Sequence, residues 1–270
     1  MAKKRLDTAI VELGLVESRQ KAQALIMAGE VYVNGQKRLK AGAPVEADDT
    51  IEIRERKALR YVSRGGLKLE KAMSLWPIDL RDRVCADIGA STGGFTDCML
   101  QNGARLVYAV DVGYNQLDWR LRTHPQVLCM ERTNARYLTK EHIPEPLDFF
   151  SVDVSFISLN LILPALRPLI KEDGQAVCLV KPQFEAGKNK VGKKGVVRDP
   201  AIHLEVLERF LDHAGQAGFT VKDVTYSPIK GPEGNLEYLG FLQAGRGSPY
   251  EGDLKALVEQ SHSIWKEEQP

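Results

Sequence analysis

The chain has 270 residues, of which 43% are apolar and 27% are charged, enough for one large hydrophobic core and a smaller second domain. Its formal net charge is only +1, but the first 71 residues carry 15 Lys or Arg against 10 Asp or Glu, and the rest carry 22 against 26. A basic module joined to a nearly neutral one suits a nucleic-acid-binding unit attached to a catalytic domain, although surface cations are often only solubilising.

The sequence also argues against several classes of protein. Its first residues are charged and lead into an amphipathic pattern, unlike a signal peptide, and its longest charge-free apolar run, residues 154–166, is shorter than the roughly 20 residues that cross a bilayer. We therefore expect a cytoplasmic protein without a membrane-bound function. The four cysteines lie far apart, with no C-x-x-C pair, so we expect reduced, buried thiols and no metal site. They are Cys85, Cys98, Cys129 and Cys178.

Residues 5–30 predict two short helices. Their apolar faces are expected to include Leu6, Ile10 and Leu13 in the first and Ala22, Leu25 and Ile26 in the second. A turn at Gly14 separates them, Ser18 is a candidate cap for the second, and Gly29 ends it.

The segment after Gly29 predicts short strands. Residues 31–35 form a strand that closes with an Asn-Gly hairpin turn, and further strands are expected around residues 45 and 51–53. Together with the two helices they make a compact α+β module. Six cations on one side of this module are candidates for RNA binding: Arg5, Arg19, Lys21, Lys37, Arg38 and Lys40.

The pattern of residues 5–35, from Arg5-Leu-Asp through Ser18-Arg19 to Val33-Asn34-Gly35, resembles the S4 RNA-binding domain. The resemblance implies that the second helix and the basic loop bind RNA, mostly through phosphates and RNA shape. The alternative is a small helix–hairpin domain that serves protein contacts.

From residue 84 onward the pattern predicts alternating strands and helices. The predicted strands are residues 84–88, 106–112, 127–130, 147–154, 175–181, 221–226 and 238–243; the predicted helices are residues 94–102, 115–122, 158–170, 201–216 and one from residue 251. This order predicts an α/β fold, the class I (Rossmann-like) methyltransferase sheet with its last strand antiparallel. We expect an S4-like domain at residues 1–58, a linker at 59–63 and a methyltransferase domain at 64–270.

The segment DIGASTGGF, residues 87–95, follows the first strand of this sheet and opens a helix. Open parallel sheets bind ligands at such a turn, where glycines let the backbone approach closely. Thr92 is a candidate cap for the helix. A dinucleotide fingerprint would have a glycine where Ser91 stands, and the acidic Asp87 suits a ligand with an amino group and a sulfonium charge. We therefore expect S-adenosylmethionine rather than a nicotinamide cofactor.

The next two strand ends extend this predicted site. Asp111 is placed to accept hydrogen bonds from both ribose hydroxyls, and residues 133–135 stand where an adenine edge would be read. Each of these could also be a strand-end turn without a ligand. The expected cofactor-binding residues are Asp87, Gly89, Ala90, Ser91, Thr92, Gly93, Gly94, Phe95, Asp111, Val112, Asn134 and Ala135.

The fourth strand end bears on which atom is methylated. Residues 153–156 read DVSF rather than the Asn/Asp-Pro-Pro-aromatic turn of enzymes that methylate base amino groups, and Cys178 is in mid-strand rather than after a proline, as a cytosine-C5 nucleophile would be. Four alternating charges remain near the predicted pocket: Lys68, Asp153, Lys181 and Glu237. Two lysines and two carboxylates suit a weakly acidic hydroxyl such as a ribose 2′-OH; the alternative is four ordinary surface charges.

These residues resemble the Lys-Asp-Lys-Glu tetrad of FtsJ-type ribose 2′-O-methyltransferases. The whole chain is similar to the TlyA/hemolysin A family, on the motifs at residues 63–68, 87–96, 153–159, 180–185 and 231–237. The resemblance implies S-adenosylmethionine as cofactor, Lys68, Asp153, Lys181 and Glu237 as the catalytic set, and cytidine in ribosomal RNA, not DNA, as the acceptor. The alternative is a non-catalytic RNA-binding or hemolysin-type protein that retains the fold, and a base rather than the ribose is a third possibility.

Two roles stay open at this point. Lys181 acts either as a general base, which requires a neutral amine, or as an orienting group that stabilises the developing alkoxide, which we prefer. The Gly-rich segment at residues 183–199 carries Lys188, Lys190, Lys193, Lys194 and Arg198. It is either a loop that clamps RNA over the pocket or a solvated loop without such a role.

Overall fold

The computed structural model describes residues 4–53 and 60–267, apart from the side chains of Ala28, Lys188 and residues 265–267. The chain divides into two compact units, residues 1–59 and 60–270, and each is described by itself. Residue 59, the first of the predicted linker, lies outside the described residues, as do residues 54–58 of the predicted S4-like domain. Tyr61, also within the predicted linker, is buried in a hydrophobic core of the second unit.

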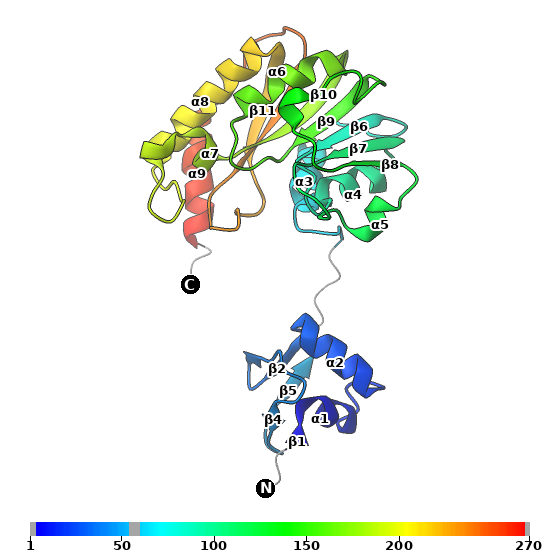
Figure 1. Ribbon diagram of the computed structural model, residues 1–270. Coiled ribbons are helices and arrows are strands. Elements are labelled where there is room, and N and C mark those ends of the chain that lie inside the picture. Colours follow the sequence, from blue (N-terminus) through cyan, green and yellow to red (C-terminus); the bar gives the residue numbers. More distant parts are fainter. Residues whose placement is uncertain (1–3, 54–59, 268–270) are drawn as a thin grey trace. The chain divides into compact units, whose positions relative to one another are not determined.

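The first unit is the α+β module that the sequence predicts (Figure 1). Its helices are α1 (Leu6–Glu12) and α2 (Arg19–Ala28). Its strands are β1 (Lys4–Arg5), β2 (Val31–Val33), β3 (Gln36–Lys37), β4 (Pro44–Val45) and β5 (Ile51–Ile53). A three-stranded antiparallel sheet has the order β3-β2-β5, and β1 pairs with β4. Apolar side chains of both helices and of β2 and β4 form one core.

The predicted ends of α2 are confirmed. Ser18 Oγ accepts a hydrogen bond from the Lys21 backbone nitrogen at 3.2 Å, and Gly29 ends the helix with a φ of +73°, a left-handed conformation that glycine adopts without steric cost. The expected burial of Leu13 is wrong, because α1 ends at Glu12 and leaves this side chain 60% exposed.

A seven-stranded sheet forms the centre of the second unit, as predicted (Figure 1). Its strands are β6 (Val84–Ile88), β7 (Leu106–Val110), β8 (Val127–Met130), β9 (Leu147–Val152), β10 (Ile170–Val180), β11 (Phe219–Tyr226) and β12 (Tyr238–Ala244). The order is β11-β12-β10-β9-β6-β7-β8, and β12 runs antiparallel to both of its neighbours. The order reverses between β6 and β9, which is where open α/β sheets bind ligands.

Helices cover both faces of this sheet (Figure 1). The α-helices are α3 (Gly66–Leu75), α4 (Gly94–Gln101), α5 (Trp119–Arg122), α6 (Leu163–Leu166), α7 (Pro182–Glu185), α8 (Pro200–Gln216) and α9 (Leu254–Glu267). The 3-10 turns are η1 (Ala135–Tyr137), η2 (Leu159–Leu161), η3 (Arg167–Leu169) and η4 (Lys188–Lys190). Among the described helices, none is long and apolar enough to span a membrane.

Two predicted helices are shorter than expected. Residues 158–170 form three short turns, η2, α6 and η3, instead of one helix, and β10 begins already at Ile170. Pro164 and Pro168 are the second residues of α6 and η3. Proline has no backbone N–H and favours helix starts over helix interiors, so each proline begins a new short turn here instead of continuing one helix. The predicted helix at residues 115–122 is reduced to α5.

Candidate active site

The first predicted cofactor residue, Asp87, is buried at the end of β6 and bound to the protein itself. Its Oδ2 accepts hydrogen bonds from the backbone nitrogen and hydroxyl of Thr96, at 2.9 and 2.7 Å, and its Oδ1 accepts one from the Ser151 hydroxyl at 3.2 Å. Burial raises the pKa of Asp87 to about 6, against the opposing effect of the Thr96 hydrogen bonds. Asp87 therefore ties the start of α4 to the sheet and still lines the cavity beside it.

The glycines of the loop after β6 have two different roles. Gly89 has a φ of +86°, and a Cβ there would lie 2.5 Å from the Asp153 carbonyl oxygen, so only glycine lets this loop approach the end of β9. Gly93 is the N-cap of α4, with no side-chain cap, so the predicted capping by Thr92 is wrong. A Cβ on Gly93 would lie 2.3 Å from Leu121: this glycine permits close packing of α5.

Asp111, just beyond β7, has a fixed carboxylate. Its Oδ2 accepts a hydrogen bond from the backbone nitrogen of Ser91, and its Oδ1 accepts one from that of Gly113, both at 2.7 Å. Each oxygen keeps a second lone pair for another donor. Asp111 thus joins the loop after β6 to the loop after β7 and faces the cavity between them.

Two adjoining cavities collect nearly all of the predicted cofactor residues. A cavity of about 230 Å³ lies against the loop after β6, and its walls include Asp87, Gly89, Ala90, Ser91, Thr92, Gly94 and Phe95. A cavity of about 440 Å³ lies next to it, and its walls include Asp111, Val112, Asn134 and Ala135. The two share Gly89, Ser91, Asp153 and Ser155. Gly93 lines neither of them.

The four predicted catalytic residues come together from four separate elements. Lys68 Nζ, from α3, lies 2.8 Å from Glu237 Oε2 and 3.4 Å from Asp153 Oδ2. Lys181 Nζ, just beyond β10, lies 2.6 Å from Asp153 Oδ1. Asp153 therefore bridges the two lysines, and the four side chains form one connected row, Glu237–Lys68–Asp153–Lys181.

This row is largely shielded from solvent. The side chain of Glu237 is 1% exposed and that of Lys68 is 9% exposed, so their attraction is stronger than that of a surface pair. Burial lowers the pKa of Lys68, but the attraction of Asp153 and Glu237 outweighs it, so the pKa lies above its usual value. Lys68 is therefore a permanent cation that holds the two carboxylates in place.

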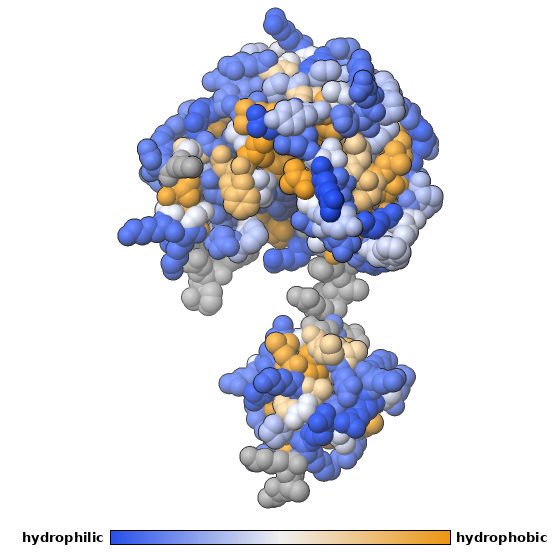
Figure 2. All heavy atoms as spheres, viewed as in Figure 1, coloured by the Kyte–Doolittle hydropathy of each residue, from blue (hydrophilic) through white to orange (hydrophobic). Residues whose placement is uncertain are grey.

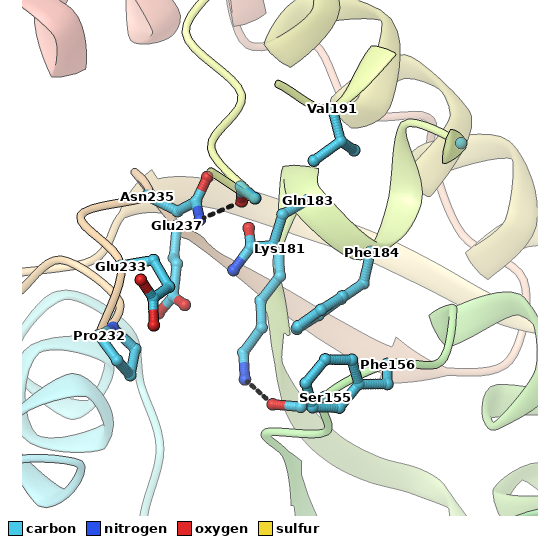
Figure 3. A pocket seen from close by; sticks show the side chains of 12 residues that line it. Ser155, Phe156, Lys181, Gln183, Phe184, Val191, Pro232, Glu233, Asn235 and Glu237 are labelled. Atoms are coloured by element: carbon cyan, nitrogen blue, oxygen red, sulfur yellow. Dashed lines mark hydrogen bonds between the residues drawn. The ribbon is translucent and has the colours of Figure 1, made fainter. Parts of the chain in front are cut away.

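A third cavity, of about 720 Å³, opens on the other side of Lys181 (Figure 3). It shares Ser155, Lys181, Pro232 and Glu237 with the 230 Å³ cavity. Its wall includes Phe156 and Phe184, whose ring centroids are 4.9 Å apart. Phe156 is 90% exposed and has a φ of +64°, a costly conformation for a bulky residue and one found mainly at functional sites. Around this hollow, the space-filling view shows apolar surface on the face that carries α7 (Figure 2).

The Gly-rich segment at residues 183–199 is hydrogen-bonded to the hairpin bearing Glu237. Asn235 Oδ1 accepts a hydrogen bond from the Val197 backbone nitrogen at 3.0 Å, and Asn235 Nδ2 donates one to the Gly195 carbonyl at 2.9 Å (Figure 3). Val197 in turn accepts a hydrogen bond from buried His203, whose other ring nitrogen contacts the Tyr238 hydroxyl at 2.8 Å. Burial lowers the pKa of His203 to about 4, so this link is neutral near pH 7.

The predicted RNA-binding cations of the first unit fall into two groups. Arg5 and Arg19 both bind Asp7, a buried carboxylate of the Arg5-Leu-Asp motif, at 3.0 and 2.9 Å. Hydrogen bonding from Arg5 holds the pKa of Asp7 far below its usual range, although burial opposes the shift. Lys21 lies 3.5 Å from Glu17. The side chains of the other three, Lys37, Arg38 and Lys40, are exposed.

Several residues of the site were not among the predicted ones. Ser155 lies 3.2 Å from Lys181 Nζ and lines all three cavities. Gln116 and Ile157 line the 440 Å³ cavity, and Gln183 lines the 720 Å³ cavity. Ser155, Ile157 and Gln183 stand inside the motifs at residues 153–159 and 180–185, but no periodicity or spacing marks them or Gln116 as cavity residues. They reach the cavities only through the fold.

The sheet order, its antiparallel strand and the cavities at the reversal point define a protein of the α/β methyltransferase class. Residues 61–244 match the model of the FtsJ-like methyltransferase family and residues 4–51 match that of the S4 domain. The chain belongs to the FtsJ-like methyltransferase family and carries an S4 domain.

Similar proteins agree with this assignment. The chain is 49% identical to YqxC of Bacillus subtilis, over 98% of this chain and 96% of that protein. It is 43% identical to the 16S/23S rRNA (cytidine-2'-O)-methyltransferase TlyA of Mycobacterium tuberculosis, over 88% and 89%. A solved structure from Streptococcus thermophilus that carries a hemolysin name is 46% identical, covers 99% of this chain and 98% of its own, and has a TM-score of 0.77. The resemblance that the sequence analysis drew is thus confirmed.

Proposed function

We propose that this protein transfers a methyl group from S-adenosylmethionine to the ribose 2′-hydroxyl of cytidine in ribosomal RNA. One observation carries the proposal. The row Glu237–Lys68–Asp153–Lys181 lies where the 230 Å³ cavity meets the aromatic-walled 720 Å³ cavity. A methyl donor on one side and a nucleoside on the other would meet at Lys181.

The donor site fits S-adenosylmethionine by the chemistry of its residues. The fixed Asp111 carboxylate offers lone pairs to the ribose hydroxyls, the loop after β6 presents backbone close to the ligand, and Asn134 and Ala135 stand at the adenine end. When bound, S-adenosylmethionine supplies the reactive methyl group. Asp87 attracts the ligand's positive charge from the wall of the adjoining cavity.

The tetrad would then orient and activate the acceptor hydroxyl. Asp153 holds Lys181 Nζ, and Lys181 stabilises the negative charge that grows on the 2′-oxygen as its proton passes to solvent water. Lys68 stays protonated and fixes both carboxylates. On this proposal, most of the rate acceleration comes from positioning of the acceptor and from electrostatic stabilisation. On this account Lys181 is the orienting group, the role that the sequence analysis prefers.

The remaining assignments belong to the same proposal. The S4 domain would bind RNA phosphates through the cations of its surface, chiefly Lys37, Arg38 and Lys40, which are exposed. The division into an S4-like domain at residues 1–58, a linker at 59–63 and a methyltransferase domain at 64–270 is part of the same proposal, as is action in the cytoplasm, where ribosomal RNA is found.

Methyl transfer to ribosomal subunits tests the proposed function. Purified protein, radiolabelled S-adenosylmethionine and subunits from cells that lack the gene are expected to yield labelled RNA. Because 2′-O-methylation protects the neighbouring phosphodiester, the modified sites resist alkaline cleavage and can be mapped. Label that appears in a base after digestion to nucleosides would contradict ribose methylation. No label, together with no binding of S-adenosylmethionine, would favour the hemolysin-type alternative.

A further inference from the structure

Gln183 stands in the wall of the 720 Å³ cavity with a polar atom that has no partner. It belongs to α7, two residues after Lys181, and its side chain points into the cavity (Figure 3). Its Oε1 is buried, yet no described residue donates a hydrogen bond to it. Native proteins leave few buried carbonyl oxygens unpaired, and each one calls for an explanation.

The other buried or fixed polar groups of this wall are already engaged. The amide of Asn235 holds Val197 and Gly195. Glu237 binds Lys68. Ser155 contacts the ammonium group of Lys181. Among these lining groups, Gln183 is therefore the one whose buried acceptor a ligand would satisfy.

A nucleobase next to this amide would meet a complementary hydrogen-bonding edge. Cytosine presents an amino group at N4 beside an acceptor nitrogen at N3, and a carboxamide presents an acceptor oxygen beside a donor nitrogen. Uracil has an acceptor oxygen in place of the amino group. With the amide held in the orientation that buries Oε1, that oxygen would face Gln183 Oε1 with no hydrogen between them. The rings of Phe156 and Phe184 offer stacking surface in the same cavity, as single-stranded RNA recognition commonly uses.

We propose that Gln183 is a specificity-determining residue whose side-chain oxygen accepts a hydrogen bond from the N4 amino group of the acceptor cytosine. This inference rests on the proposed function and adds to it the group that reads the base. Glu233 also lines the cavity, but it is exposed, and a solvated carboxylate discriminates less than a buried oxygen, because water replaces the lost partner.

The test compares cytidine with uridine at one position. Once the modified cytidine has been mapped, ribosomal subunits are prepared with cytidine or uridine there, and kcat/KM for methyl transfer is measured on both. The wild-type protein is expected to prefer cytidine by roughly 10- to 100-fold, the range for a good base contact. Gln183→Leu is expected to bring the ratio close to one, mainly by slowing transfer to cytidine.

Two further variants make the result specific. Gln183→Glu keeps an acceptor for N4 and is expected to retain the preference for cytidine. Gln175→Leu changes a glutamine in the middle of β10, where its amide lies 3.5 Å from the Pro77 carbonyl, and serves as the matched control with an unchanged ratio. Affinity for S-adenosylmethionine, measured for every variant, reports an intact fold.

Two outcomes would overturn the inference: an unchanged ratio in Gln183→Leu, whether or not transfer to both substrates slows equally, or loss of the preference in Glu233→Ala but not in Gln183→Leu. Absence of methyl transfer by the wild-type protein to any subunit would instead overturn the proposed function, so the two failures are distinguishable.

Discussion

The tetrad of the second unit and the cationic surface of the first unit hold their charges in different ways. The four side chains of the tetrad come from distant parts of the chain, are between 1% and 20% exposed, and form one continuous row. In the first unit, Arg5, Arg19 and Lys21 are each more than half exposed, and each pairs with a carboxylate no more than 12 positions away in the chain. Fixed, buried charges suit chemistry at one atom, whereas exposed charges suit attraction to a polyanion.

The comparison predicts that changes in the tetrad act on the rate and that changes on the cationic surface act on affinity. The same distinction applies within the second unit. Replacement of a residue that holds the cofactor should change cofactor affinity but not the rate of the chemical step.

Replacement of Lys181 should have the largest effect. Lys181→Ala removes the cation that faces the developing alkoxide, and loss of one such group commonly costs about 100- to 1000-fold in kcat. Single-turnover methyl transfer measures the rate, and titration measures affinity for S-adenosylmethionine, which should change little. Lys171→Ala, at the other end of β10 where Lys171 pairs with Asp148, is the matched control. Normal turnover with only a loss of cofactor affinity would contradict the assignment.

Replacement of Asp111 should weaken cofactor binding instead. Hydrogen bonds to a charged group contribute about 1.5–3 kcal/mol each, so Asp111→Ala is expected to raise the Kd for S-adenosylmethionine by roughly 10- to 100-fold, with a smaller effect on kcat at saturation. Asp79→Ala, which changes an exposed carboxylate paired with Arg81, should leave the Kd unchanged. A large fall in kcat at saturating cofactor would place Asp111 in the chemical step and break the comparison.

The pH dependence of cofactor binding should reveal Asp87. Because burial raises the pKa of its carboxyl to about 6, the group becomes neutral as the pH falls through 6 and loses its attraction for a cationic ligand. Affinity for S-adenosylmethionine should therefore decrease between pH 7 and pH 5, by at most about tenfold per pH unit for one proton.

The raised pKa of Asp87 should make the stability of the unliganded protein change with pH in the opposite direction to cofactor affinity. A carboxyl group whose pKa is raised by folding stabilises the folded state. This stabilisation is complete below the pKa of the group in the unfolded chain and is lost as the pH rises through about 6. Asp87→Asn should remove both pH dependences. Wild-type affinity that is constant between pH 5 and 7 would exclude a role for this charge in binding.

Changes on the cationic surface should have the smallest effect for each residue. If Arg38 and Lys40 each contact one phosphate, every replacement by Ala should weaken RNA binding by about fivefold at physiological salt and lower the slope of log K against log[salt] by roughly 0.7–0.9. Filter binding over a salt series measures both quantities. The rate at saturating RNA should stay as it is. Lys255→Ala, an exposed position on α9, is the control, and an equal effect there would argue against a dedicated surface.

Much of the fold could be predicted from the sequence because strands, helices and turns depend on local patterns. The alternation of strands and helices, the loop at residues 87–95 and the end of α2 at Gly29 are all local features. The chemical types of Lys68, Asp153, Lys181 and Glu237 also mark them as candidates, and the last three each stand at an end of a predicted strand.

Only the tertiary structure decided how these groups are paired. Lys68 and Glu237 lie 169 positions apart in the chain, and no periodicity reports a contact over that separation. The inward hydrogen bonds of Asp87, the aromatic wall of the third cavity and the unpartnered oxygen of Gln183 depend in the same way on which strand ends become neighbours in the sheet. Burial and hydrogen-bond partners depend on packing. Packing brings together residues that are far apart in the chain, and the sequence around each residue does not indicate which distant residue it contacts.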